Sequence, residues 1–196
     1  MHGRRFDPLL LRGEGLKRTS YTALGGVLSA VSITVLLLTI FPFATYALPP
    51  LAGTFLIPLV IECGKKWAFC AYAAVSLVAL LIVPDVEAKT LFIVFFGYYP
   101  IIKAALENLK SRVWEWLAKV GVFNLATIGG YIVLSQVGFS MDAFRLEGVS
   151  LPLSAFLLMF LLAGNVIFVI YDIGLSRVLP LYFMRVQPSI RKMFRF

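Results

Sequence analysis

Residues 92–109 read Phe92-Ile-Val-Phe-Phe-Gly-Tyr-Tyr-Pro-Ile-Ile-Lys-Ala-Ala-Leu-Glu-Asn-Leu109. The stretch begins as an apolar run and ends as an amphipathic helix that carries Lys103 and Glu107 four residues apart. Between these halves, Gly97-Tyr98-Tyr99-Pro100 combines helix-breaking residues with paired aromatic side chains. Because proline has no N–H to donate, the pattern predicts a break inside a helix that is long enough to cross a membrane.

The 196-residue chain as a whole is strongly apolar. Hydrophobic residues make up 60% and charged residues 14%, with a mean hydropathy of +0.91. Soluble domains are nearer half apolar and a quarter charged, so we expect an all-α integral membrane protein with one transmembrane domain. The long charged segment before the first apolar run does not fit a cleavable signal. The net charge is +8, and the basic residues flank the apolar runs. This placement favours a role in membrane topology over nucleic-acid binding.

Apolar runs predict six membrane-spanning helices. The 43 uncharged residues from Thr19 to Ile61 would form about 65 Å of helix, enough for two crossings with a proline-rich turn between them. Residues 85–89 form a polar loop in this scheme, residues 1–18 a basic cytoplasmic segment, and residues 179–196 a basic amphipathic tail after a transmembrane domain at 19–178. The expected helices lie near residues 20–41, 47–62, 67–84, 92–109, 120–141 and 148–171.

The basic residues predict the orientation of these helices. With the N-terminus and the C-terminus in the cytoplasm, all of the 18 lysines and arginines except Lys89 and Arg145 lie on the inner side. A wrong number of helices would scramble this alternation. We therefore expect a multi-pass membrane protein with both termini in the cytoplasm.

Two patterns could serve binding. In the first helix, Thr22, Gly26 and Ala30 are four residues apart and line one face, which is either a docking face for a partner or a packing face within the helix bundle. In the fourth, Tyr98 and Tyr99 either stack on a flat ligand or pack a proline kink.

The remaining polar residues are less specific. The amides of Asn124, Asn165 and Gln136 either hydrogen-bond between helices or bind a neutral ligand. Lys103 with Glu107, and Asp172 near Arg177, are expected to form solvated helix ends at the inner boundary. A binding pocket would then lack deep charge, which argues against a proton relay.

Catalytic and cofactor chemistry is poorly supported. His2 is the only histidine, so serine–histidine or cysteine–histidine catalysis and a histidine metal site are implausible. Cys63 and Cys70 do not make a zinc site, and no phosphate-binding glycine loop is present. We expect a protein that is not an enzyme and that holds no cofactor or metal.

Three stretches over residues 18–178 resemble the substrate-binding S components of energy-coupling factor (ECF) transporters. They are Tyr21-Thr-Ala-Leu-Gly-Gly-Val-Leu-Ser-Ala30, Phe41-Pro-Phe-Ala-Thr-Tyr-Ala-Leu-Pro-Pro50 and Gly97-Tyr-Tyr-Pro-Ile-Ile-Lys103. The resemblance implies a subunit that captures a vitamin-like or other micronutrient ligand from outside. Such a subunit docks on a T component and a pair of ATPases through small residues of its first helix. The family's usual Ala-x-x-x-Ala is here Gly26-x-x-x-Ala30, and no vitamin-specific signature is present.

The resemblance also assigns residues to roles. It implies docking through Gly26 and Ala30, a lid that includes Phe43 and Tyr46, and a pocket that includes Tyr98, Tyr99, Gln136 and Asn165. Two other interpretations remain open. A non-transporting scaffold, such as an MreD-like cell-shape subunit, would fill the space between the fourth, fifth and sixth helices with side chains. A small secondary carrier would need coupling groups near the middle of the membrane.

Overall fold

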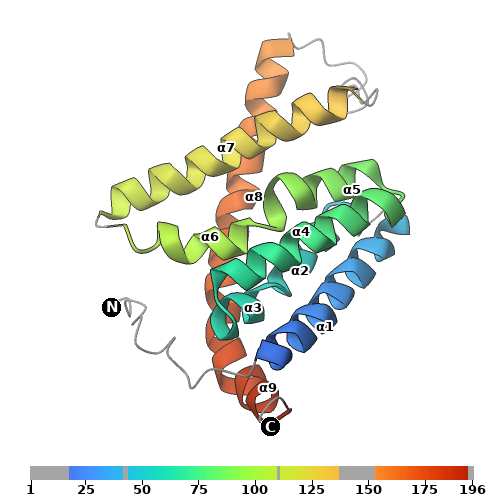
Figure 1. Cartoon of the computed structure of the whole chain (residues 1–196). Helices are drawn as coiled ribbons and strands as arrows, with labels where there is room; N and C mark the ends of the chain where they lie inside the picture. The colour runs from blue at the N-terminus through green and yellow to red at the C-terminus, as the bar shows by residue number, and fades with distance from the viewer. Residues whose placement is uncertain (1–17, 42–43, 110, 137–152, 194–196) are drawn as a thin grey trace.

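The computed structural model describes residues 18–41, 44–109, 111–136 and 153–193, and these residues fold into helices with short turns and no strand (Figure 1). Five of the helices are long and apolar enough to cross a membrane: Ser20–Ile40, Lys65–Ile82, Val86–Leu106, Arg112–Gln136 and Leu161–Val186. A shorter apolar helical segment covers Leu48–Glu62. The all-helical prediction is therefore confirmed, and the apolar helices indicate a multi-pass membrane protein.

The long uncharged run folds back on itself, as predicted. Helix α1 (Arg18–Leu37) continues into a short 3-10 turn (Leu38–Ile40), and Phe41 before Pro42 is extended, as a residue before proline prefers to be. The return segment is two short helices, α2 (Leu48–Thr54) and α3 (Ile57–Glu62), where we expected one helix over 47–62. Pro58 explains the interruption, because it cannot donate a hydrogen bond to the carbonyl of Thr54.

Helix α4 (Lys65–Ile82) packs along α1 (Figure 1). Its contact face carries the small residues Ala68, Ala71, Val75 and Ala79, which recur every three or four positions and are buried. Small side chains let two helices approach closely, which is how helices associate when lipid surrounds them.

The stretch at residues 92–109 breaks at the predicted place but begins earlier. Helix α5 (Val86–Leu91) is capped by Asp85, whose carboxylate accepts a hydrogen bond from the Ala88 N–H at 3.0 Å. The predicted polar loop at 85–89 is therefore mostly helical. A π-helical turn (Phe92–Phe96) follows, closed by the Gly97 N–H donating to the Phe92 carbonyl at 2.8 Å. Helix α6 (Tyr99–Leu106) then starts with Pro100 in its first turn.

The last helices are longer than the apolar runs that predicted them. Helix α7 (Arg112–Gln136) begins eight residues before the expected start at Val120, and α8 (Leu153–Leu181) continues ten residues past the expected end at Tyr171. A π-helical turn (Tyr182–Val186) and α9 (Gln187–Met193) extend the same path into the basic tail. Figure 1 shows α7 lying across one end of the molecule and α8 running past α6 and α4 toward the C-terminus.

Candidate functional site

Aromatic rings fill the space between the broken helix, α7 and α8. The ring of Phe95 stacks on Tyr99 with 4.7 Å between centroids and meets Phe123 and Phe168 edge-on at 5.3 and 5.6 Å. Phe123 and Phe168 stack on each other at 4.9 Å. These are the spacings at which aromatic pairs attract. Tyr99 and Phe168 are fully buried, so side chains occupy the region where we expected ligand stacking.

The two tyrosines of the predicted ligand site differ in their surroundings. Tyr99 is buried, and its hydroxyl donates to Asp172 Oδ1 at 2.6 Å. Tyr98 is half-buried, with its ring 6.0 Å from Tyr72 and 6.2 Å from Phe95. Tyr99 therefore links α6 to α8. Of the two tyrosines, only Tyr98 keeps a solvent-accessible surface.

Beneath the rings lies a cluster of buried charges that the sequence analysis did not predict. Lys103, Lys119 and Asp172 are 3%, 2% and 3% exposed. Lys103 Nζ pairs with Asp172 Oδ1 and also donates to the Asp172 carbonyl at 3.1 Å. Lys119 Nζ lies 3.0 Å from Asp172 Oδ2. The expectation that Lys103 and Asp172 belong to solvated helix ends is wrong, because each finds its partner on another helix.

Two further carboxylates complete this charge cluster (Tyr99, Lys103, Glu107, Glu115, Lys119 and Asp172). Glu107 Oε1 lies 2.8 Å from Lys103 Nζ and 3.1 Å from Lys119 Nζ. Glu115 Oε1 lies 2.9 Å from Lys119 Nζ, one helical turn away. The cluster therefore sets three carboxylates against two ammonium groups, which leaves one negative charge.

A sequence signal for the cluster did exist. Tyr99 and Lys103, Lys103 and Glu107, and Glu115 and Lys119 are each four residues apart, so each pair shares a helix face. Asp172 interrupts an apolar run that continues to Ile173. If the first charge after each apolar run marks the membrane boundary, these residues are assigned to solvated ends, although they pair with one another inside the bundle.

The amides and the first loop make contacts within the chain. The side-chain amides of Asn124 and Asn165 each donate from Nδ2 to Oδ1 of the other at 3.1 Å, which is the helix-to-helix alternative. Gln136 is exposed at the end of α7. Tyr46 donates its hydroxyl to Glu87 Oε2 at 2.6 Å, so the first loop contacts the start of α5. Phe43, the other predicted lid residue, lies outside the described residues.

The predicted docking face is exposed in the part of the chain that the structure describes. Thr22, Gly26 and Ala30 are exposed, and a Cβ added to Gly26 would meet no atom within 4 Å. Gly25, on the next face, lies against Leu59 at 3.9 Å from such a Cβ. This small-residue face (Thr22, Gly26, Ala30) is therefore open at Gly26 and Ala30, where it is not packed against another described helix.

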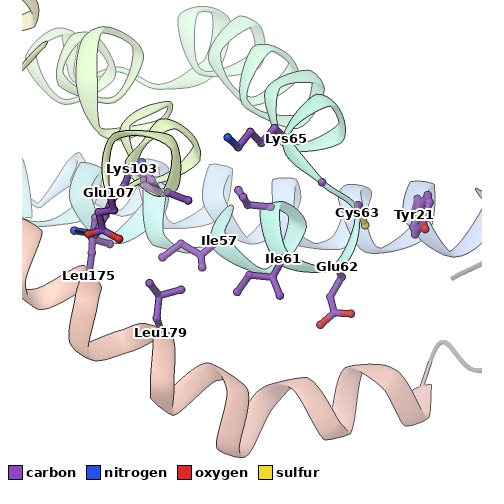
Figure 2. Close-up of a pocket in the computed structure, with 14 residues that line it drawn as sticks. Tyr21, Ile57, Ile61, Glu62, Cys63, Lys65, Lys103, Glu107, Leu175 and Leu179 are labelled. Carbon is purple, nitrogen blue, oxygen red and sulfur yellow. Dashed lines mark ion pairs between the residues drawn. The ribbon is translucent and has the colours of Figure 1, made fainter. Parts of the chain in front are cut away.

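A cavity of about 370 Å³ lies between α1, α3, α6 and α8, next to the charge cluster (Figure 2). Lys103 and Glu107 form one wall, and apolar side chains such as Ile57 and Leu179 form the middle. No group of three or more His, Cys, Asp and Glu side chains in the described ranges is arranged to hold a metal ion.

Comparisons with protein-family models, with curated proteins and with solved structures return no match to this chain.

Proposed function

We propose that the chain is a substrate-capture subunit, similar to an S component, of an ECF-type importer in a bacterial cytoplasmic membrane. In this proposal the protein crosses the membrane six times, with Leu48–Glu62 as the shortest crossing and both termini in the cytoplasm. The distribution of lysine and arginine supports this orientation. The protein would bind a micronutrient and depend on a T component and ATPase subunits for transport.

The exposed small-residue face of α1 carries the proposal. A helix that packs only within its own bundle gains nothing from small residues on its outer side, such as Gly26 and Ala30. In lipid, larger apolar side chains cover a helix equally well, whereas small ones allow a second helix to approach closely. This is the face through which the resemblance implies contact with a T component.

The contacts of the first loop support a lid. Thr45 donates its hydroxyl to Asp85 Oδ2 at 2.7 Å, and Tyr46 donates to Glu87 at 2.6 Å. These two bonds tie the proline-rich loop to the beginning of the helix that carries Tyr98. Hydrogen bonds to a charged group stabilise a contact by about 1.5–3 kcal/mol each. A ligand bound with micromolar affinity provides about 8 kcal/mol, which is enough to open or close such a loop.

A second candidate function is a non-transporting membrane scaffold. The aromatic packing of Phe95, Tyr99, Phe123 and Phe168 favours it, because these side chains fill the space between the broken helix, α7 and α8. A scaffold would also use the small-residue face of α1, but with a structural partner.

Substitutions on the small-residue face distinguish docking from passive exposure to lipid. Gly26→Leu or Ala30→Leu is expected to reduce co-purification with a co-expressed T component and its ATPases at least tenfold, because the larger side chains hold the helices apart. Ala74→Leu on α4 is the matched control, since Ala74 is also a small exposed residue on a long apolar helix. Pull-down through a tag on this chain measures the effect.

Three results of this pull-down are decisive. Loss with Gly26→Leu and retention with Ala74→Leu supports docking through α1. Retention with both substitutions means that the complex uses another face. A wild-type chain that does not associate, under conditions where the T component and ATPases assemble, overturns the importer proposal and favours the scaffold.

A further inference from the structure

We propose that the cavity between α1, α3, α6 and α8 binds a small amphipathic zwitterion, with its anionic group at Lys65 and its ammonium group at Glu107. This site lies at the end of the bundle where the basic residues gather, and it is separate from the aromatic region near Tyr98. The inference does not depend on the proposed import function, since a scaffold could bind the same ligand.

The cavity has the size and lining of a small-molecule site. Its volume of about 370 Å³ falls at the lower end of the range of about 300–1,000 Å³ that is typical of ligand pockets. The middle is apolar, formed by Ile57, Val60, Ile61, Leu175 and Leu179. Figure 2 shows Ile57 and Ile61 between Glu107 on one side and Glu62 on the other. An aliphatic chain fits such a middle because burial removes its surface from water.

Glu107 provides the acceptor for an ammonium group. Both lysines of the charge cluster contact the same oxygen, Oε1, and among the described residues no hydrogen bond reaches Oε2, so Oε2 can accept from a ligand. The Glu107 side chain is 23% exposed and lines the cavity, whereas Lys103 beside it is buried. Because the cluster holds one more carboxylate than ammonium groups, an added ammonium group would neutralise it.

Lys65 provides the opposite charge on another wall. It is exposed and lines the cavity, and its ammonium group makes no hydrogen bond or ion pair with the described residues. Lys65 is also the first residue of α4, and its N-cap Gly64 supplies no side-chain cap for the free N–H groups there. The positive end of the helix therefore adds to the ammonium group of Lys65 in attracting an anion.

Glu62 lines the same cavity but is turned away. Its Oε1 accepts from Gln187 Nε2 at 2.7 Å and from the Tyr182 hydroxyl at 3.2 Å. Figure 2 shows the Glu62 side chain directed toward the C-terminal helical segment. Because the Glu62 carboxylate points away from the cavity, its electrostatic repulsion of an anion bound at Lys65 is reduced. An anion without an amine would leave Oε2 of Glu107 unused, and an amine without an anion would leave Lys65 unpaired.

Two sources could supply this chemistry: a soluble amino acid with an apolar body, or the ethanolamine headgroup of a membrane lipid. Both carry an ammonium group and an anion joined to apolar atoms. The experiment therefore has one arm for each source and uses Cys63, which lines the cavity, as the reporter.

The reporter protein is the full chain with Cys70→Ser, placed in phosphatidylcholine nanodiscs. Burial, and then the nearby carboxylate of Glu62, raises the pKa of Cys63 to about 11, so labelling is followed at about pH 9, where the fraction of thiolate is small but measurable. The label is a methanethiosulfonate reagent, because it reacts with thiols and is not consumed by the amines of the probes. We expect an ω-amino acid in the series from γ-aminobutyrate to aminooctanoate to slow labelling about tenfold. Hexanoate and hexylamine, each carrying a single charge, are expected to have little effect.

Matched variants assign the charges. Glu107→Gln and Lys65→Met are each expected to abolish the protection of Cys63. Glu115→Gln removes a carboxylate from the same charge cluster but lies outside the cavity, and Lys66→Met removes the neighbouring exposed lysine. Both controls are expected to keep the protection. Thermal unfolding of each variant shows whether it is folded before labelling is compared.

The lipid arm replaces phosphatidylcholine with phosphatidylethanolamine and adds no soluble probe. Slower labelling there, lost in Glu107→Gln and Lys65→Met, supports the zwitterion site and identifies a lipid as its occupant. Protection by a soluble ω-amino acid in phosphatidylcholine supports the site with a soluble ligand. Equal protection by hexanoate or hexylamine overturns the zwitterion proposal. Absence of protection by every probe in both membranes overturns the site itself.

Discussion

Asp172→Leu is expected to lower the free energy of unfolding by about 3–5 kcal/mol, the usual cost of removing one partner from a buried ion pair. The substitution removes the acceptor of Tyr99, Lys103 and Lys119 at once. It also separates α8 from α6 and α7, because Asp172 is the member of the charge cluster that lies on α8. The detergent-solubilised protein is titrated with a denaturing surfactant, and circular dichroism follows the loss of helix. The difference in the free energy of unfolding between the variant and the wild type measures the effect.

The size of this effect depends on geometry and not on net charge. Removing Asp172 leaves two carboxylates and two ammonium groups, so a cluster governed by net charge alone would become more stable. Asp172→Asn should cost less than Asp172→Leu, because the amide oxygen can still accept from Tyr99 or Lys103. Glu87→Gln, which removes a carboxylate from the exposed loop contact, should cost less than about 1 kcal/mol. Unchanged stability in Asp172→Leu would contradict the role of the cluster.

Gly53→Ala is expected to destabilise the protein by about 3 kcal/mol or more, at the upper end of what overpacking costs. A Cβ at this position would lie 2.0 Å from the Phe96 carbonyl oxygen and 2.9 Å from its carbon. Pro100 cannot donate to that carbonyl, so α2 approaches the backbone of the broken helix where its hydrogen-bond ladder is interrupted. Since the obstacle is backbone, no rotamer change can relieve the clash. Thermal unfolding and gel filtration of the purified variant give the measurement.

The glycines of α1 are the controls for this effect. Gly25→Ala would bring a Cβ 3.9 Å from Leu59, an ordinary contact, and Gly26→Ala would meet no atom within 4 Å. Alanine also favours a helix over glycine by about 1 kcal/mol. Both variants should therefore be as stable as the wild type or more so. If Gly53→Ala is equally well tolerated, the close approach of α2 to Phe96 is contradicted.

The sequence predicts the helical class and the main break because both arise from local chemistry. The lengths of the apolar runs set the helices, and Pro42 and Pro100 mark places where a regular helix cannot continue. The sequence predicts the ends of the helices less well. The sixth expected helix ended at Tyr171 because Asp172 is charged, although α8 continues to Leu181.

The candidate site was less predictable because it depends on contacts between distant residues. Lys103 and Asp172 are 69 positions apart, and neither signals its partner locally. The ambiguity between hydrogen bonding and ligand binding at Asn165 likewise needed the position of Asn124 to be resolved. The exposure of the small-residue face of α1 depends on which side of the helix α4 covers, and a pattern of small residues fits either side.

Native mass spectrometry of this chain, co-expressed with a T component and ATPases and released gently from membranes, tests the capture proposal most directly. We predict a complex that contains the chain, one T component and a pair of ATPases, and a bound small molecule on the chain when it is isolated alone. A chain that appears only by itself or with copies of itself, without a small molecule, while the T component and ATPases remain assembled, would contradict the proposal.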